Sequence, residues 1–116
     1  MSTADPHNLF ARIIRREIPA QIVYEDELCL AFRDIAPQAP LHVLLIPKTP
    51  LVNVGAALPE DQALLGHLLL KAGEIARAAG YTDFRLVSNS GAGAQQSVLH
   101  LHFHILAGRD FTWPPG

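Results

Sequence analysis

The chain of 116 residues contains a single cysteine, Cys29, so an intramolecular disulfide is excluded and the paired cysteines of most structural zinc sites are missing. No apolar run approaches the roughly 18 residues that a membrane-spanning helix needs. Residues 1–7 contain neither the basic n-region nor the apolar h-region of a secretory signal. Nine Lys and Arg stand against eleven Asp and Glu, which gives a net charge of −2 and argues against nucleic acid or an anionic membrane as a partner. These absences predict a cytoplasmic protein.

The length predicts one domain, residues 1–116, because a chain of this size buries roughly two-thirds of its unfolded surface in a single core. Residues 1–7 are a candidate disordered segment, and residues 107–116 are a candidate C-terminal tail. Cys29 stands in an apolar segment without a basic neighbour that would lower the pKa of its thiol. We therefore expect a buried side chain without chemistry.

Two segments have apolar residues at helical spacing, residues 8–17 and residues 59–79. In the second segment Pro59 suits the first helical position and Gly80 suits the residue just beyond the end. Its apolar stripe consists of Leu64, Leu65, Leu68, Leu69, Ala72, Ile75, Ala76 and Ala79.

Five further segments predict strands: residues 21–24, 29–34, 42–46, 84–89 and 97–106. An acidic turn joins the first two into a hairpin, and prolines bound the third. The order of these elements predicts an α+β fold in which two helices accompany a five-stranded, mainly antiparallel sheet.

The last of these strands carries the most informative residues. With a strand period of two, His100, His102 and His104 share one face. A solvated face would more often carry Lys, Thr or Glu, and a core face would not carry three imidazoles. The opposite face of this strand would consist of Leu99, Leu101, Phe103 and Ile105.

Two kinds of chemistry compete for the row of histidines. Three imidazoles can bind zinc, but three same-face residues of one strand span roughly 13 Å, and no carboxylate or thiol nearby completes a ligand set. Nucleophilic catalysis at phosphorus is the alternative, because neutral imidazole, with a pKa of about 6.5, is a good nucleophile at neutral pH. Residues 89–97 favour this second interpretation, since they supply small residues, amides and hydroxyls that can hold an anion. We expect neither a metal nor another cofactor.

At this point the chain resembles the histidine triad superfamily, whose mark is His-x-His-x-His followed by apolar residues. The likeness is greatest to its Hint branch, the histidine triad nucleotide-binding proteins that hydrolyse nucleoside phosphoramidates. Separate motifs in the right order carry the resemblance: residues 29–40, the triad at 100–104 and the tail Trp113-Pro114-Pro115-Gly116. The resemblance implies the fold of that superfamily, a twofold dimer with the long helix and a sheet edge at its interface, and purine nucleotides such as AMP, GMP and adenosine phosphoramidates as ligands.

The resemblance also implies catalytic roles. His102 corresponds to the nucleophile that attacks phosphorus and forms a nucleotidyl-histidine intermediate. His104 corresponds to a residue that contacts the phosphate and helps the leaving group, and His100 to one whose backbone carbonyl orients the nucleophilic ring. His42 would lie behind His100 in the same polar network, and Ser97 would place its hydroxyl near the scissile bond.

For the nucleotide, the resemblance assigns Asp34 to the ribose hydroxyls and Trp113 to a tail that reaches toward the partner's site. Gln95 stands where the family usually carries glycine, so its backbone is not expected to adopt a positive φ freely. The phosphate-proximal loop positions are Asn89, Gln95 and Gln96, and the apolar base slot consists of Phe10, Ile13, Ile18, Phe32 and Ile35.

A second class of function remains open at this stage. The same pocket could hold a purine nucleoside monophosphate without turnover, while the dimer surface recruits a protein. The protein would then be a non-enzymatic adaptor, and one pocket would serve both functions.

Overall fold

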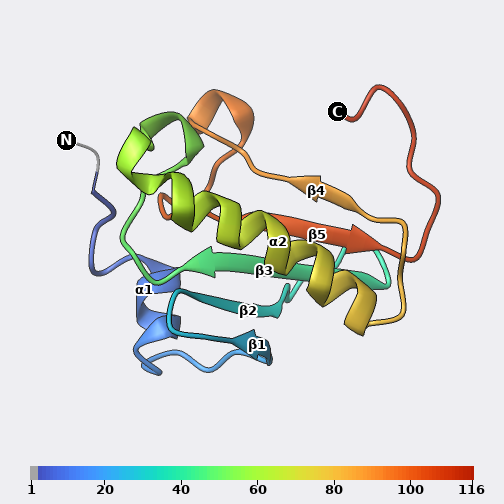
Figure 1. The fold of residues 1–116 in the computed structure, drawn as a ribbon, viewed down its shortest axis with the longest axis horizontal. Coiled ribbons are helices and arrows are strands. Elements are labelled where there is room, and N and C mark those ends of the chain that lie inside the picture. Colours follow the sequence, from blue (N-terminus) through green and yellow to red (C-terminus); the bar gives the residue numbers. More distant parts are fainter. Residues whose placement is uncertain (1–2) are drawn as a thin grey trace.

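Five strands form one open sheet in the order β1-β2-β3-β5-β4, with every neighbouring pair antiparallel (Figure 1). The computed structural model describes residues 3–116. All seven residues of the central strand β3 are buried, as its nearly continuous apolar sequence requires. The strands are β1 (Ile22–Glu25), β2 (Cys29–Arg33), β3 (Leu41–Pro47), β4 (Arg85–Val87) and β5 (Phe103–Ala107).

Helices cover the two faces of the sheet differently. The long helix α2 (Gln62–Ala78) crosses one face of the sheet (Figure 1). Its Leu68 and Ala72 pack against every second side chain of the strands, those that point to this face. The short helix α1 (Leu9–Ile14) packs Phe10 and Ile13 on the opposite face. Two α-helices and five antiparallel strands confirm the predicted α+β class. Three short 3-10 helices complete the elements: η1 (Val54–Ala56), η2 (Pro59–Asp61) and η3 (Ala92–Ala94).

The strand that carries the triad is shorter than the sequence predicts. Regular pairing covers only Phe103–Ala107, because the chain bends at residues 98–100. The Leu101 amide donates to the Leu51 carbonyl oxygen at 2.7 Å, outside the ladder between β3 and β5. Leu99 consequently does not share the buried face of Leu101, and 54% of its surface is exposed. The strict alternation expected over residues 97–106 is therefore wrong for its first half.

The N-terminal segment is anchored to the domain. Thr3 forms an isolated bridge with Leu51, and the Ala4 amide donates to the Pro50 carbonyl oxygen at 2.8 Å. Ala4 is almost fully buried, so ordering this segment removes apolar surface from water. These contacts hold residues 3 and 4 against the domain, the disorder expected for residues 1–7 stays a prediction, and Met1 and Ser2 lie outside the described residues.

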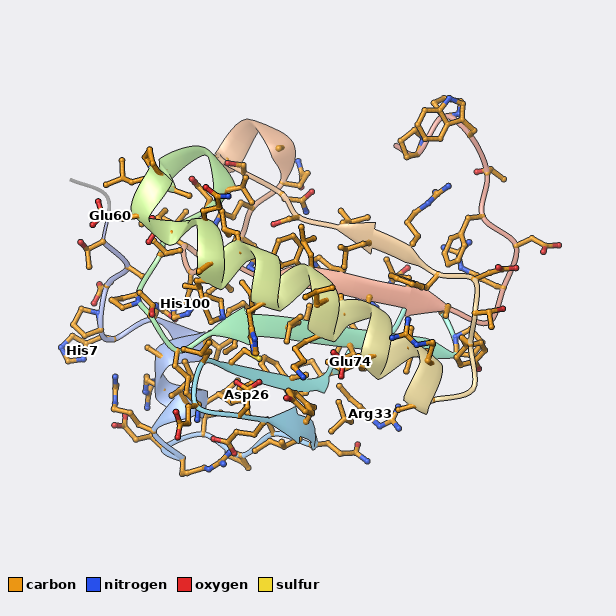
Figure 2. All side chains as sticks on the ribbon, in the orientation of Figure 1. His7, Asp26, Arg33, Glu60, Glu74 and His100 are labelled. Carbon is orange, nitrogen blue, oxygen red and sulfur yellow. The ribbon has the colours of Figure 1, made fainter. Side chains whose placement is uncertain are left out.

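The apolar stripe of α2 only partly faces the sheet. Leu68, Ala72 and Ile75 are buried, whereas Leu69 is about half exposed and Leu70, beside the stripe, is 71% exposed. Glu74 of this helix is exposed and lies at the edge between α2 and the strands (Figure 2). Within residues 3–116, no helix has both the length and the apolar character to cross a membrane.

Candidate active site

A cavity of about 710 Å³ lies on the face of the sheet that carries α1. Aliphatic and aromatic side chains form one part of its wall, and the rest carries Asp34, Ser97, His102 and His104. Such a division suits a ligand with one flat apolar part and one anionic part. The expected base-slot residues all line this cavity: Phe10, Ile13, Ile18, Phe32 and Ile35.

His102 is held in a single orientation by the backbone. Its Nδ1 atom lies 2.8 Å from the carbonyl oxygen of His100, and a carbonyl can only accept a hydrogen bond. Nδ1 therefore carries the proton of the neutral ring, and Nε2 keeps its lone pair. The Phe10 ring packs edge-on against His102 with centroids 4.9 Å apart. Burial lowers the pKa of His102, so the ring is neutral and nucleophilic at neutral pH.

His100 supports this arrangement from outside the cavity, where it is fully buried (Figure 2). Its Nε2 lies 2.9 Å from the Pro47 carbonyl oxygen, so Nε2 carries the ring proton. Its Nδ1 then accepts from the Asn8 side-chain amide at 3.1 Å. The Asn8 side-chain oxygen caps α1 by accepting from the Ala11 amide at 2.8 Å. Asn8 thus couples the start of a helix to the triad, a connection that its place in the sequence does not reveal.

His42 contacts His104 and not His100. The two residues are diagonal neighbours on paired strands, because Leu44 lies opposite His104 and His42 opposite Leu106. The His42 Nε2 atom lies 2.9 Å from Nδ1 of His104. Burial, together with the nearby His102 and His42, lowers the pKa of His104 to about 4.

Asp34 follows β2 and lines the cavity with a mostly buried carboxylate. Its Oδ1 accepts from the Ala36 amide at 2.8 Å, which fixes the side chain in a turn. Its Oδ2 lies 3.4 Å from the His42 Nε2 atom. The carboxylate is therefore placed between the apolar part of the cavity and the histidines.

The loop before the triad lies beside the same cavity. Gln95 adopts the left-handed conformation, with φ 70° and ψ 27°, so the chain makes this turn at a residue whose Cβ renders it costlier than it would be for glycine. Asn89, Gln95 and Ser97 line the cavity.

Gln96 has a structural place in this loop and does not line the cavity. Its Oε1 accepts from the Gly91 amide at 2.8 Å and from the Asn53 side chain at 3.1 Å. Its Nε2 donates to the carbonyl oxygens of Val52 at 2.7 Å and Val98 at 3.1 Å. These four bonds use the whole amide, so the side chain holds the loop together.

Trp113 lies outside the cavity, on the extended tail, and 83% of its surface is exposed. Sequence reasoning also missed cavity residues, among them Leu44, Val98 and Gln21. Leu44 could have been found from strand alternation, because it shares a face with His42. Val98 and Gln21 lie outside the regular strands, so the alternation of side chains along a strand does not predict which face of the sheet they occupy.

Two other features lie apart from this cavity. Asp26, Cys29 and His67 bring metal-ligating atoms within 4.8 Å of one another. The Asp26 carboxylate already accepts from His67 and Tyr24, each at 2.7 Å, and from two backbone amides at 2.8 Å, so hydrogen bonds account for this cluster. Burial raises the pKa of the Cys29 thiol to about 12, which opposes a thiolate ligand.

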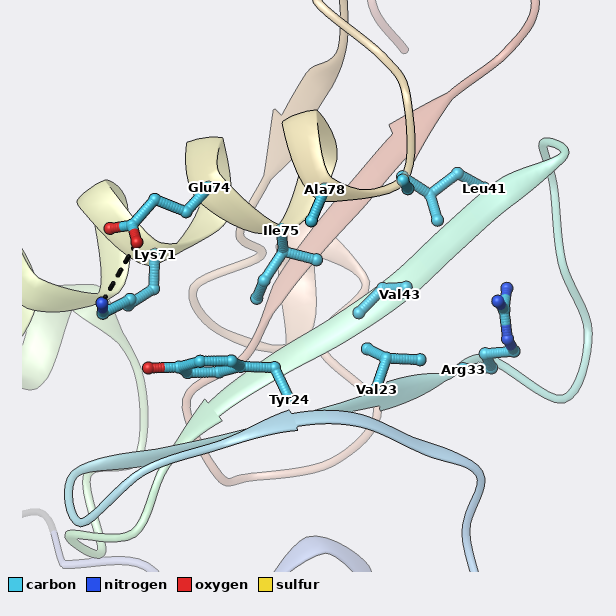
Figure 3. A pocket seen from close by; sticks show the side chains of 10 residues that line it. Val23, Tyr24, Arg33, Leu41, Val43, Lys71, Glu74, Ile75 and Ala78 are labelled. Atoms are coloured by element: carbon cyan, nitrogen blue, oxygen red, sulfur yellow. Dashed lines mark hydrogen bonds and ion pairs between the residues drawn. The ribbon is translucent and has the colours of Figure 1, made fainter.

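A second cavity, of about 380 Å³, lies between α2 and strands β1 to β3 (Figure 3). Apolar residues such as Val43 and Ile75 line it, and Lys71 and Glu74 pair at 3.2 Å on its rim. Among residues 3–116, no histidine, cysteine or serine lines it, which leaves the first cavity as the candidate active site.

Comparison with known proteins gives the family of this arrangement. The HIT domain model matches residues 15–111, a span that includes the triad and Asp34. The chain belongs to the HIT family. A HIT-like protein of Synechocystis sp. is 68% identical over 109 residues, which cover 93% of this chain and 96% of that protein. One of Synechococcus elongatus is 60% identical over the same shares of the two chains.

Solved structures of HIT proteins have the same fold. A HIT family hydrolase from Legionella pneumophila superposes with a TM-score of 0.92 at 46% identity, covering 95% of this chain and 100% of that one. A HIT family hydrolase from Clostridium thermocellum gives a TM-score of 0.89 at 39% identity, covering 94% and 96%.

Proposed function

We propose that this HIT protein is a purine nucleoside phosphoramidase, which hydrolyses the P–N bond of adenosine 5′-phosphoramidates through a nucleotidyl-His102 intermediate. One observation carries the proposal: the backbone carbonyl of His100 holds the proton of His102 on Nδ1 and leaves Nε2 free beside the cavity. A neutral, oriented imidazole is the group that nucleophilic substitution at phosphorus requires. The hydrolase names of the structural relatives support the same class of reaction.

In this proposal, separate parts of the cavity bind the base, the ribose and the phosphate of the nucleotide. The base packs between apolar side chains such as Phe10 and Phe32, whose rings are 5.6 Å apart. The ribose hydroxyls donate to Asp34, and the phosphate lies beside Ser97 and the histidines. Because the apolar wall has few polar groups for the base edge, we expect both AMP and GMP to bind.

The reaction proceeds in two displacements. First, the lone pair of His102 Nε2 forms a bond to phosphorus while the P–N bond breaks, and the departing nitrogen leaves as an amine after it gains a proton. Second, a water oxygen bonds to phosphorus and loses a proton while the P–Nε2 bond breaks, which releases the nucleoside monophosphate. Neither displacement requires a metal or a redox cofactor, since imidazole is both nucleophile and leaving group.

A twofold dimer belongs to the same proposal. Leu69 and Leu70 form an exposed apolar surface on α2, and β4 has only β5 as a neighbour within residues 3–116. An exposed apolar helix surface and a free strand edge are each typical of a surface that a second copy covers. The exposed Trp113 would then extend toward the partner's site. The cytoplasmic location stays a prediction from the sequence.

The decisive experiment follows the covalent intermediate. Intact-protein mass spectrometry after rapid acid-free quenching with adenosine 5′-phosphoramidate should show an adduct of AMP mass, and AMP should be released in parallel. The variant His102→Ala should show neither, while His7→Ala, which removes an exposed histidine, should behave as the native protein. AMP binding without an adduct or AMP release would contradict the proposal and favour the adaptor.

A further inference from the structure

The loop between β2 and β3 contacts the histidines through its backbone. The Gln38 amide lies 3.0 Å from Nδ1 of His42, and a backbone N–H can only donate. Nδ1 of His42 is therefore the acceptor and is unprotonated. The other nitrogen, Nε2, faces Oδ2 of Asp34 at 3.4 Å, and a carboxylate can only accept. Because the Gln38 amide donates and the Asp34 carboxylate accepts, the hydrogen of the neutral His42 ring lies on Nε2.

The proton position on His42 determines that on His104. Because His42 Nε2 carries a hydrogen and lies 2.9 Å from His104 Nδ1, His104 Nδ1 must accept. The neutral His104 ring then carries its hydrogen on Nε2. This is the one ring nitrogen of His104 that the described residues leave for a ligand in the cavity. Two hydrogen bonds therefore lead from a fixed amide to His104, whose Nε2 hydrogen remains as a donor for a ligand in the cavity.

The same chain opposes a positive charge on His104. A proton on His104 Nδ1 would face the hydrogen on His42 Nε2. His42 could avoid this clash only by moving its own proton to Nδ1, which faces the Gln38 N–H. The titratable groups around His104 are His42, His102 and Asp34, and only Asp34 favours the charged ring. Geometry and surroundings therefore agree on a neutral ring.

The residue that carries this amide is held in place by the turn after β5. The Arg109 Nε donates to the Gln38 carbonyl oxygen at 2.8 Å, and its guanidinium lies 4.3 Å from the centroid of the Phe111 ring. Gly108, at φ 97°, allows this approach, since a Cβ there would lie 2.9 Å from Cβ of Pro40. Arg109 thus braces residue 38 through the peptide unit that follows the amide in contact with His42.

We infer that the Gln38 backbone amide is a positioning group, braced by Arg109, that fixes His104 as a neutral donor through Nε2. His104 then stabilises charge on the phosphoryl oxygens and does not protonate the leaving group, because a neutral imidazole N–H is a very weak acid. The proton that the departing nitrogen gains comes from a water molecule, and the hydroxide that this leaves takes up the proton released by the attacking water in the second displacement. The part of this inference that concerns turnover rests on the proposed function, whereas the tautomer of His104 does not.

The test compares two substitutions at one position. Gln38→Pro removes the amide hydrogen, and Gln38→Ala keeps it while removing the side-chain bond from Gln38 Nε2 to the Ala36 carbonyl oxygen at 3.1 Å. Nitrogen-15 NMR of the histidine rings should show His104 protonated on Nε2 alone at pH 7 in the native protein and in Gln38→Ala. Gln38→Pro should show a mixture of tautomers and a raised pKa for His104.

Turnover gives a second readout. With adenosine 5′-phosphoramidate, Gln38→Pro should lower kcat about 10-fold with little change in KM, because the donor acts mainly in the transition state. Its pH profile should also shift, whereas Gln38→Ala should keep the native profile. A native His104 protonated on Nδ1 would overturn the inference even if Gln38→Pro does not fold. Native protein without turnover but with the expected tautomer would overturn the proposed function alone.

Discussion

The Nδ1 atom of His102 lies 2.8 Å from the carbonyl oxygen of His100, two residues earlier in the chain. This contact is possible because the chain has not yet entered the regular ladder of β5, which begins at Phe103. In an extended strand that peptide oxygen would point sideways, toward a neighbouring strand. The bend before β5 therefore makes the backbone a partner of the nucleophile.

Substitution of Asn8 should separate two roles of one side chain. Asn8→Ala removes both the cap of α1 and the donor to His100, and we expect it to lower the free energy of unfolding by about 1–2 kcal/mol. Asn8→Asp keeps the cap but offers His100 Nδ1 no donor. Chemical denaturation should therefore place Asn8→Asp between the native protein and Asn8→Ala. Equal stability of all three proteins would contradict the double role.

Gln95 stores backbone strain that glycine would relieve. The left-handed conformation of residue 95 costs a residue with a Cβ about 1–2 kcal/mol, and glycine avoids this cost. Glycine also has more conformational freedom in the unfolded chain, which offsets part of its advantage. Gln95→Gly should consequently be more stable than Gln95→Ala by up to about 1 kcal/mol, measured by thermal unfolding. If alanine is as stable as glycine there, the turn does not carry that strain in solution.

Stability should fall as the pH falls below 6.5. Burial lowers the pKa values of His42, His100 and His102, and it lowers that of His104 to about 4, so the unfolded chain binds more protons in this window. The stabilisation is complete above pH 6.5 and is lost as the pH falls toward about 4. Each such histidine adds up to about 1.4 kcal/mol per pH unit.

Thermal unfolding between pH 7.5 and pH 4.5 measures this slope. The variant His7→Gln, which removes an exposed histidine, should leave the slope unchanged. His100→Asn should reduce it, because one buried group no longer titrates. A flat profile in the native protein would contradict the prediction.

The exposed apolar surface of α2 predicts the oligomeric state. Leu70→Glu places a charge on that surface and should convert the proposed dimer to a monomer at micromolar concentration, as measured by sedimentation equilibrium. Glu74→Gln, on the same helix but at the rim of the second cavity, should leave the dimer intact. A native protein that sediments as a monomer would rule out the dimer.

The site could be predicted in part because strand periodicity is a local property. Alternation places His102 and His104 on one face and also places Phe32 on the face of Leu44. Gln96 illustrates the limit, since its position beside the loop glycines suggested a phosphate contact. Its four hydrogen bonds instead depend on residues 52 and 53, which are distant in the sequence.

The sequence by itself determined the fold class, the single core and the presence of three imidazoles near one another. The spacing of apolar residues and the types of neighbouring residues are local properties, which short segments of the sequence already contain. The tertiary structure decided which atom contacts which nitrogen. His42 reaches His104 only through the register of β3 with β5, and Arg109 reaches the loop at Gln38 across 71 positions of the chain. Hydrogen bonds depend on distances of a few tenths of an ångström between residues far apart in the chain, and only the folded backbone sets those distances.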